Sequence, residues 1–69
     1  MKISARNHWS GVVKGMVKGP VSTEVTLTIA SGVEVVSVIS THSAEVLGLA
    51  VGKPAQAFVK ASSVLIGTE

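Results

Sequence analysis

The chain has no cysteine, which removes one of the usual means of stabilising a domain as short as 69 residues. No disulfide can form, and with only His8 and His42 as histidines a structural zinc cluster is excluded as well. A domain of this size buries only about 60% of the surface that its unfolded chain exposes. Oligomerisation is the reinforcement that remains, so we expect a single domain, residues 1–69, that forms a homo-oligomer.

Aspartate is also missing, and charged residues of either sign are few. They make up 14% of the chain, against a usual share of about 25%, whereas 46% of the residues are apolar. Such a composition indicates that part of the surface meets another subunit. The acidic residues number four and the formal net charge is +2. Few groups would therefore repel an anion, and the positive charge is too slight to attract a phosphate backbone strongly.

The residues that enzymes use for catalysis are scarce. The chain has no cysteine nucleophile, no paired carboxylates at short spacing and no supported Ser-His-acid arrangement. Long apolar runs are missing too, since none approaches the roughly 18 residues of a membrane span. The residues after Lys2 do not have the apolar run that a cleavable signal peptide requires. We expect a cytoplasmic protein that is not an enzyme, carries no organic cofactor and has no membrane partner.

Alternation of apolar and polar residues predicts the first strands. From Val21 to Ile29 the odd positions are apolar and the even positions polar, with Thr23 as the one break. The preceding stretch 9–17 is rich in β-branched residues, and its glycines, Gly11 and Gly15, predict a bend or bulge. A third strand is expected over 33–40, with apolar residues on both faces, so both faces should be covered.

A short helix is expected next. The hydroxyl-rich stretch 40–43 suits a helix N-terminus, and Gly48 stands where a C-terminal cap belongs. A fourth strand is expected over 55–60 and a fifth over 64–67. Three strands, a helix and two strands are the order of the five-stranded OB-type barrel, so the fold class is an OB-like all-β barrel with little helix. An SH3-like or open β-roll arrangement of the same elements is the alternative.

Many OB barrels bind single-stranded nucleic acid, which requires aromatic stacking platforms beside a basic groove. The chain offers only Trp9 and Phe58 as such platforms, with six cationic residues spread along its length. The ordinary interpretation of these two side chains is that they fill the core or a subunit interface. We therefore expect no nucleic-acid partner, and keep this function as the alternative.

The opening residues favour a different ligand. In an extended segment, Ser4 and Arg6 would project from the same face, where a hydroxyl and a guanidinium can both donate hydrogen bonds to a small anion. Further short segments carry a resemblance to a known family, and with the opening one they cover residues 3–7, 18–19, 21–25, 38–43, 47–49, 51–53 and 59–62. In this order and at these intervals they resemble the Mop domain, or molbindin, family over nearly the whole chain.

The resemblance implies a small cytoplasmic protein with an OB-like fold. Proteins of this family assemble as hexamers, trimers of dimers, and hold molybdate or tungstate between subunits, and we expect molybdenum storage and homeostasis here. The family also supplies ligand-binding domains to molybdate-responsive regulators and to molybdate transporter ATPases. This chain has room for neither a DNA-binding nor an ATPase domain, so the free-standing storage form is expected.

By position, the anion contacts of the family fall on Ser4, Arg6, Ser40, Ser43, Lys60, Ala61 and Ser62. A second oxyanion site would use Gly19, Val21 and Ser22, where the intervening Pro20 lacks an N–H. Molybdenum would be bound as its oxyanion and not as a bare cation. Two interpretations stay open beside this one: serines at a helix start can be caps and nothing more, and the chain can be a purely structural assembly module.

Overall fold

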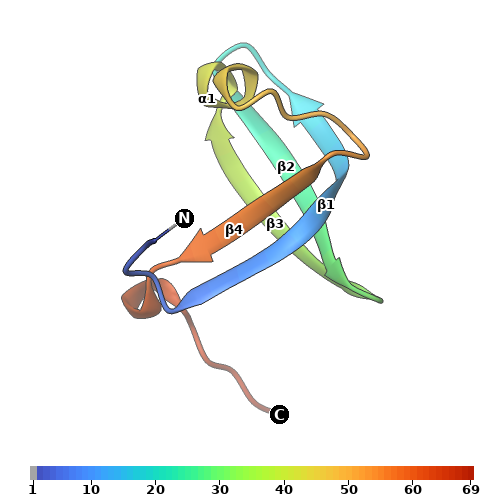
Figure 1. The fold of residues 1–69 in the computed structure, drawn as a ribbon. Coiled ribbons are helices and arrows are strands. Elements are labelled where there is room, and N and C mark those ends of the chain that lie inside the picture. The colour runs from blue at the N-terminus through green and yellow to red at the C-terminus, as the bar shows by residue number, and fades with distance from the viewer. Residues whose placement is uncertain (1) are drawn as a thin grey trace.

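The alternating residues of the first half of the chain form three consecutive antiparallel strands. In the computed structural model, which describes residues 2–69, these are β1 (Asn7–Lys18), β2 (Ser22–Ala30) and β3 (Val33–Ser40). The helix α1 (Thr41–Val46) follows, then β4 (Pro54–Val59) and a 3₁₀ turn, η1 (Ala61–Ser63). The sheet has the order β3-β2-β1-β4, and every pairing in it is antiparallel (Figure 1).

The sheet curls so that β4 crosses in front of β3, and α1 covers one end of the resulting half-barrel (Figure 1). This confirms the expected OB-like class, mostly β, with the helix between the third and fourth strands. The fully buried apolar core of the sheet is small and consists of Val13, Val25 and Leu27. Ile39 and Leu49 pack against this cluster from β3 and from the loop after α1.

The expected fifth strand is not formed. Residues 64–69 have no regular secondary structure, because η1 turns the chain away from the sheet directly after β4. The last part of the chain, red in Figure 1, extends away from the half-barrel. The expected cover on both faces of β3 is also missing within one chain, since Val36 and Val38 are 59% and 68% exposed.

The two glycines of β1 have different roles. The register of β1 against β2 shifts between Val13 and Gly15, so the expected irregularity is confirmed there. Gly11 marks a close approach of two strands: a Cβ at this position would lie 2.5 Å from the Thr28 carbonyl oxygen. A side chain at Gly11 would therefore force β1 and β2 apart.

The helix begins and ends where its caps are. Ser40 is the N-cap, and its Oγ accepts a hydrogen bond from the Ser43 N–H at 3.0 Å. Gly48 follows the C-cap residue Leu47 and has a φ of 65°, the left-handed conformation that glycine adopts without strain. Within residues 2–69, no helix combines the length and the apolar character that crossing a membrane would require.

Candidate functional site

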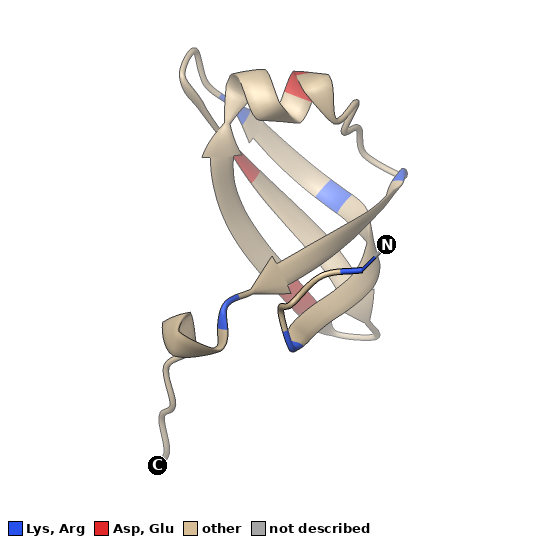
Figure 2. Ribbon diagram, turned by 60° about the vertical axis from the view of Figure 1, so that its left-hand side comes forward, with Lys and Arg blue, Asp and Glu red and all other residues tan. Residues whose placement is uncertain are grey.

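The candidate residues lie at two opposite ends of the sheet. At one end, Asn7 pairs with Val59, so the residues just before β1 and just after β4 are neighbours. We call this group the basic end; it comprises Ser4, Arg6, Lys60, Ala61 and Ser62, all of them exposed. Figure 2 shows the cationic positions that flank β1 and β4 at the end of the sheet that is remote from α1.

The expected extended conformation of residues 2–6 is wrong. The strand starts only at Asn7, and the chain bends at Ser4 and at Arg6. Residues 4 and 6 thus lie outside a strand, so the rule that side chains two positions apart project from the same face does not apply to them. Ser4 and Arg6 lie at the basic end because they directly precede β1, whose first residue pairs with the last residue of β4.

The other end carries the remaining candidates. We call it the helix end; it comprises Gly19, Val21, Ser22, Ser40 and Ser43. Ser22 pairs with Ser40 across β2 and β3, which places the turn after β1 beside the start of α1. The family-derived second site and the serines of the first site are thus neighbours in space.

One chain does not bring the two ends together. The 12 residues of β1 run from one end to the other, and a strand rises about 3.3 Å per residue. The ends are therefore separated by many times the reach of a hydrogen bond, about 3 Å. An anion that contacts Arg6 or Lys60 and also Ser40 or Ser43 has to lie between different chains.

The serines at the start of α1 form a hydrogen-bonded pair. Ser40 Oγ donates to Ser43 Oγ at 2.7 Å and also accepts from the Ser43 N–H. The capping interpretation of Ser40 is therefore confirmed. Because a hydroxyl has one proton, that of Ser40 is used within the pair, whereas the proton of Ser43 is available to a ligand.

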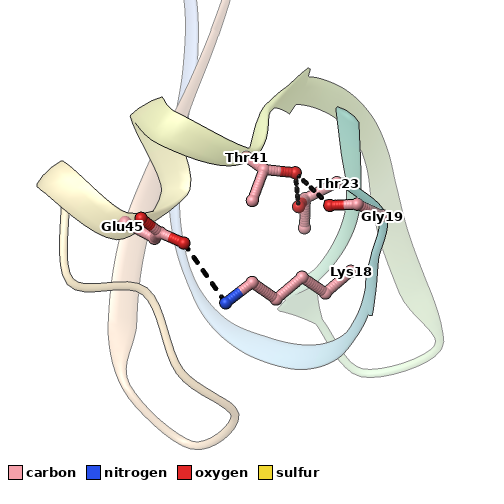
Figure 3. A network of polar contacts seen from close by, with 5 residues as sticks. All are labelled: Lys18, Gly19, Thr23, Thr41 and Glu45. Atoms are coloured by element: carbon pink, nitrogen blue, oxygen red, sulfur yellow. Dashed lines mark hydrogen bonds and ion pairs between the residues drawn. The ribbon is translucent and has the colours of Figure 1, made fainter. Parts of the chain in front are cut away.

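A buried threonine pair fixes the helix end, and sequence reasoning missed it (Figure 3). Thr41 Oγ1 donates to the Gly19 carbonyl oxygen at 2.6 Å and lies 2.8 Å from Thr23 Oγ1. The Thr41 N–H donates to the Val21 carbonyl oxygen at 2.8 Å. The signal in the sequence was Thr23 itself, a polar residue at an inward position of β2, and it is 0% exposed.

Charge pairing differs between the two ends. Lys18 forms an ion pair with Glu45 at 3.3 Å beside the threonine pair (Figure 3), and Lys14 pairs with Glu34. Within residues 2–69, no ion pair involves Arg6 or Lys60. The basic end therefore presents cations that no carboxylate neutralises at contact distance, which is the electrostatic condition for binding an anion.

The described residues contain no group of three or more His, Cys, Asp or Glu side chains that could hold a metal cation. The donors at both ends are hydroxyl, N–H and cationic groups, so their chemistry suits an oxyanion.

The aromatic residues do not form one stacking surface. Phe58 pairs with His8, and their ring centroids are 6.2 Å apart, whereas Trp9 pairs with Ala57. Successive residues of a strand point to opposite faces, so Trp9 and Phe58 lie on opposite faces of the β1–β4 pair. They are 39% and 37% exposed, so core filling is wrong for the single chain. A continuous platform for single-stranded nucleic acid is not present on these strands.

Comparisons with known proteins agree on one family. The model of the TOBE domain matches residues 3–66. Molybdenum-pterin-binding protein 2 of Clostridium pasteurianum is 47% identical over 66 residues, which cover 96% of this chain and 97% of that protein. The molybdenum transport protein ModE of Herbaspirillum seropedicae is 44% identical over the full chain, which spans only 26% of ModE.

Solved structures share the fold. MopII from Clostridium pasteurianum matches with a TM-score of 0.91 and 45% identity, over 97% of this chain and 100% of the MopII chain. The cytoplasmic molybdate-binding protein ModG, solved with molybdate bound, matches with a TM-score of 0.95 and 39% identity, over 100% of this chain and 49% of the ModG chain. The chain therefore belongs to the TOBE domain family and, within it, to the Mop, or molbindin, proteins.

Proposed function

We propose that this protein binds molybdate or tungstate as an intact oxyanion, at sites between the subunits of a homo-oligomer, and serves molybdenum storage and homeostasis in the cytoplasm. One observation carries the proposal: Arg6 and Lys60 adjoin the paired residues Asn7 and Val59 at one end of the sheet, and no ion pair within residues 2–69 involves either of them. Relatives named for molybdenum and molybdate binding support the choice of anion.

The chemistry of the donors fits a fully deprotonated tetrahedral anion. A hydrogen bond to a charged group contributes roughly 1.5–3 kcal/mol, so several donors from two chains can replace the water shell of a dianion. Phosphate keeps a proton at neutral pH, and the seven family-derived residues include no carboxylate to accept it. Phosphate should therefore bind more weakly than molybdate or tungstate.

The separation of the two ends supports sites between subunits. If the seven family-derived residues contact one ion, the basic end of one chain has to meet the helix end of another. The turn residues Gly19, Val21 and Ser22 would then contribute to a second kind of site at the same junction. A hexamer built as a trimer of dimers repeats such junctions by symmetry, and it is the assembly that we propose. Binding and release of the ion need no catalytic group.

Calorimetric titration of the purified protein with molybdate, tungstate, sulfate and phosphate, with a native mass measurement, tests the proposal. We expect heat with the first two anions only, and an oligomer. Arg6→Ala and Lys60→Ala should each weaken molybdate binding by roughly 10- to 100-fold, since each removes a charge-assisted hydrogen bond. Lys53→Ala is the matched control, because Lys53 lies in the exposed turn before β4, outside both ends.

Two outcomes would contradict the proposal. Unchanged affinity in both the Arg6 and the Lys60 variants would remove the basic end from the site. A wild-type protein that takes up no molybdate, but shifts single-stranded oligonucleotides at physiological salt, would favour the nucleic-acid function instead.

A further inference from the structure

The turn after β1 is closed by its own backbone. The Gly19 N–H donates to the Ser22 carbonyl oxygen at 2.9 Å, and a Cβ at Gly19 would lie 2.7 Å from the same oxygen. Pro20, the next residue, has a φ that its ring holds at about −65°. The turn is therefore tight, and its backbone has little freedom to change shape.

Only one backbone donor of residues 19–21 is left without a partner. The Gly19 N–H is used within the turn, and Pro20 has no N–H. Within residues 2–69, no hydrogen bond outside the helices and strands is donated by the Val21 N–H. A backbone N–H without a protein partner requires water or a ligand. Val21 is 76% exposed, so either can reach it.

Thr41 restrains the direction of this N–H from both sides. The Val21 N–H belongs to the peptide unit between Pro20 and Val21. The unit before it carries the Gly19 carbonyl oxygen, which accepts from Thr41 Oγ1 at 2.6 Å (Figure 3). The unit after it carries the Val21 carbonyl oxygen, which accepts from the Thr41 N–H at 2.8 Å. Because each peptide unit is planar, holding both neighbours leaves the middle unit little room to rotate.

Burial protects this restraint from water. Thr41 is 7% exposed, and Thr23, whose Oγ1 lies 2.8 Å from Thr41 Oγ1, is 0% exposed. Water therefore does not compete for the Thr41 hydroxyl, and the Thr23 side chain holds it from a second direction. A hydroxyl buried in this way does not contact a ligand itself. It can influence binding only through the groups that it holds.

We propose that Thr41 is a positioning residue for oxyanion binding: it holds the Val21 N–H in the direction in which that group donates to the anion. This inference rests on the proposed function, because it concerns the turn of the second site. A preorganised donor contributes more to affinity than a mobile one, since less entropy is lost on binding. Gly19 contributes to the site through the shape of the turn and not through its own N–H.

Titration of Thr41→Val with sodium molybdate tests the role of the hydroxyl. The variant lacks the donor to the Gly19 carbonyl oxygen, so the affinity of one class of sites should fall roughly 10-fold or more, as for one lost hydrogen bond to a charged group. Thr41→Ser keeps the hydroxyl and should restore most of this affinity. Leu27→Ala is the matched control for lost stability, because Leu27 is 5% exposed in the core and lies outside both ends. All variants are titrated at a temperature at which circular dichroism shows them folded.

Val21→Pro removes the same N–H directly. It should weaken the class of sites that Thr41→Val weakens. The double variant Thr41→Val/Val21→Pro should bind no more weakly than Val21→Pro alone, because both changes act on one donor. A merely structural role of Thr41 would instead give losses of affinity that add.

The results that would overturn the inference are distinct from failure of the proposed function. If the wild type binds molybdate and Thr41→Val binds it equally well, Thr41 does not position a donor. Losses that add in the double variant, or a loss in Leu27→Ala as large as that in Thr41→Val, would have the same meaning. A wild-type protein that takes up no molybdate refutes the proposed function, and this inference falls with it.

Discussion

The buried threonine pair at the helix end supplies the sharpest test of the structure. Thr41 Oγ1 has one proton and donates it to the Gly19 carbonyl oxygen, so the proton between the two threonines belongs to Thr23. Thr23 is 0% exposed and Thr41 7% exposed, which means that water cannot replace a lost partner without a change in structure. The direction of these two hydrogen bonds predicts unequal effects of the two isosteric substitutions.

Thr41→Val removes the donor to Gly19 and also the acceptor of the Thr23 proton. A buried polar group without a partner costs about 1–3 kcal/mol, so we expect a loss of about 2–3 kcal/mol in the free energy of unfolding. Thr23→Val removes only one bond that Thr41 accepts and should cost about 1 kcal/mol. Thr41→Ser keeps the hydroxyl and loses one methyl group, a cost of about 1 kcal/mol.

The double variant Thr23→Val/Thr41→Val gives the decisive comparison. Once Thr41 is valine, replacing Thr23 removes a buried hydroxyl that has no partner, so the second substitution should be neutral or stabilising. Thermal and urea unfolding, followed by circular dichroism at one fixed protein concentration, measures these differences. For a domain of this size, Thr41→Val should lower Tm by roughly 10–20 °C. The reasoning is refuted if Thr23→Val costs more than Thr41→Val, or if the two costs simply add in the double variant.

Two further predictions concern the sheet and the helix. Gly11→Ala should lower the free energy of unfolding by about 3 kcal/mol or more, because the new Cβ would lie 2.5 Å from the Thr28 backbone. Gly15→Ala is the control: its Cβ would have no heavy atom within 4 Å, so the free energy of unfolding should change by less than about 1 kcal/mol. Similar urea midpoints for these two variants would contradict the close approach of β1 and β2 at Gly11. Ser40→Ala should lower the free energy of unfolding by about 1 kcal/mol, because it removes the N-cap of α1. Ser31→Ala, at an exposed turn position, is its control. Equal stability of the two serine variants would show that the cap contributes nothing.

Local patterns in the sequence were sufficient for the elements that depend on neighbouring residues. The alternation from Val21 to Ile29, the capping serine at 40 and the glycine at 48 predicted β2 and both ends of α1, because strand period and helix caps are set within a few residues. The conformation of Ser4 and Arg6 was not predicted correctly. Their extended geometry was inferred from spacing alone, and the chain bends there before β1 begins.

The candidate residues could be selected from the sequence, but their arrangement could not. Nothing local indicates that Arg6 and Ser40 lie at opposite ends of the sheet, since this follows from the antiparallel pairing of β1 with both β2 and β4. The contact between Thr41 and Gly19 joins residues 22 positions apart, and only the packing of α1 over the turn after β1 creates it.

The sequence by itself determined the class of the chain: a small β-rich domain, poor in carboxylates and rich in hydrogen-bond donors, too short to cover its own apolar residues. These properties follow from composition and from the period of the side chains. Only the tertiary structure decided that the donors divide between two ends, that a buried threonine pair joins α1 to the turn after β1, and that residues 64–69 do not join the sheet. Each of these depends on contacts between residues far apart in the chain, and such contacts are fixed by how the curled sheet packs.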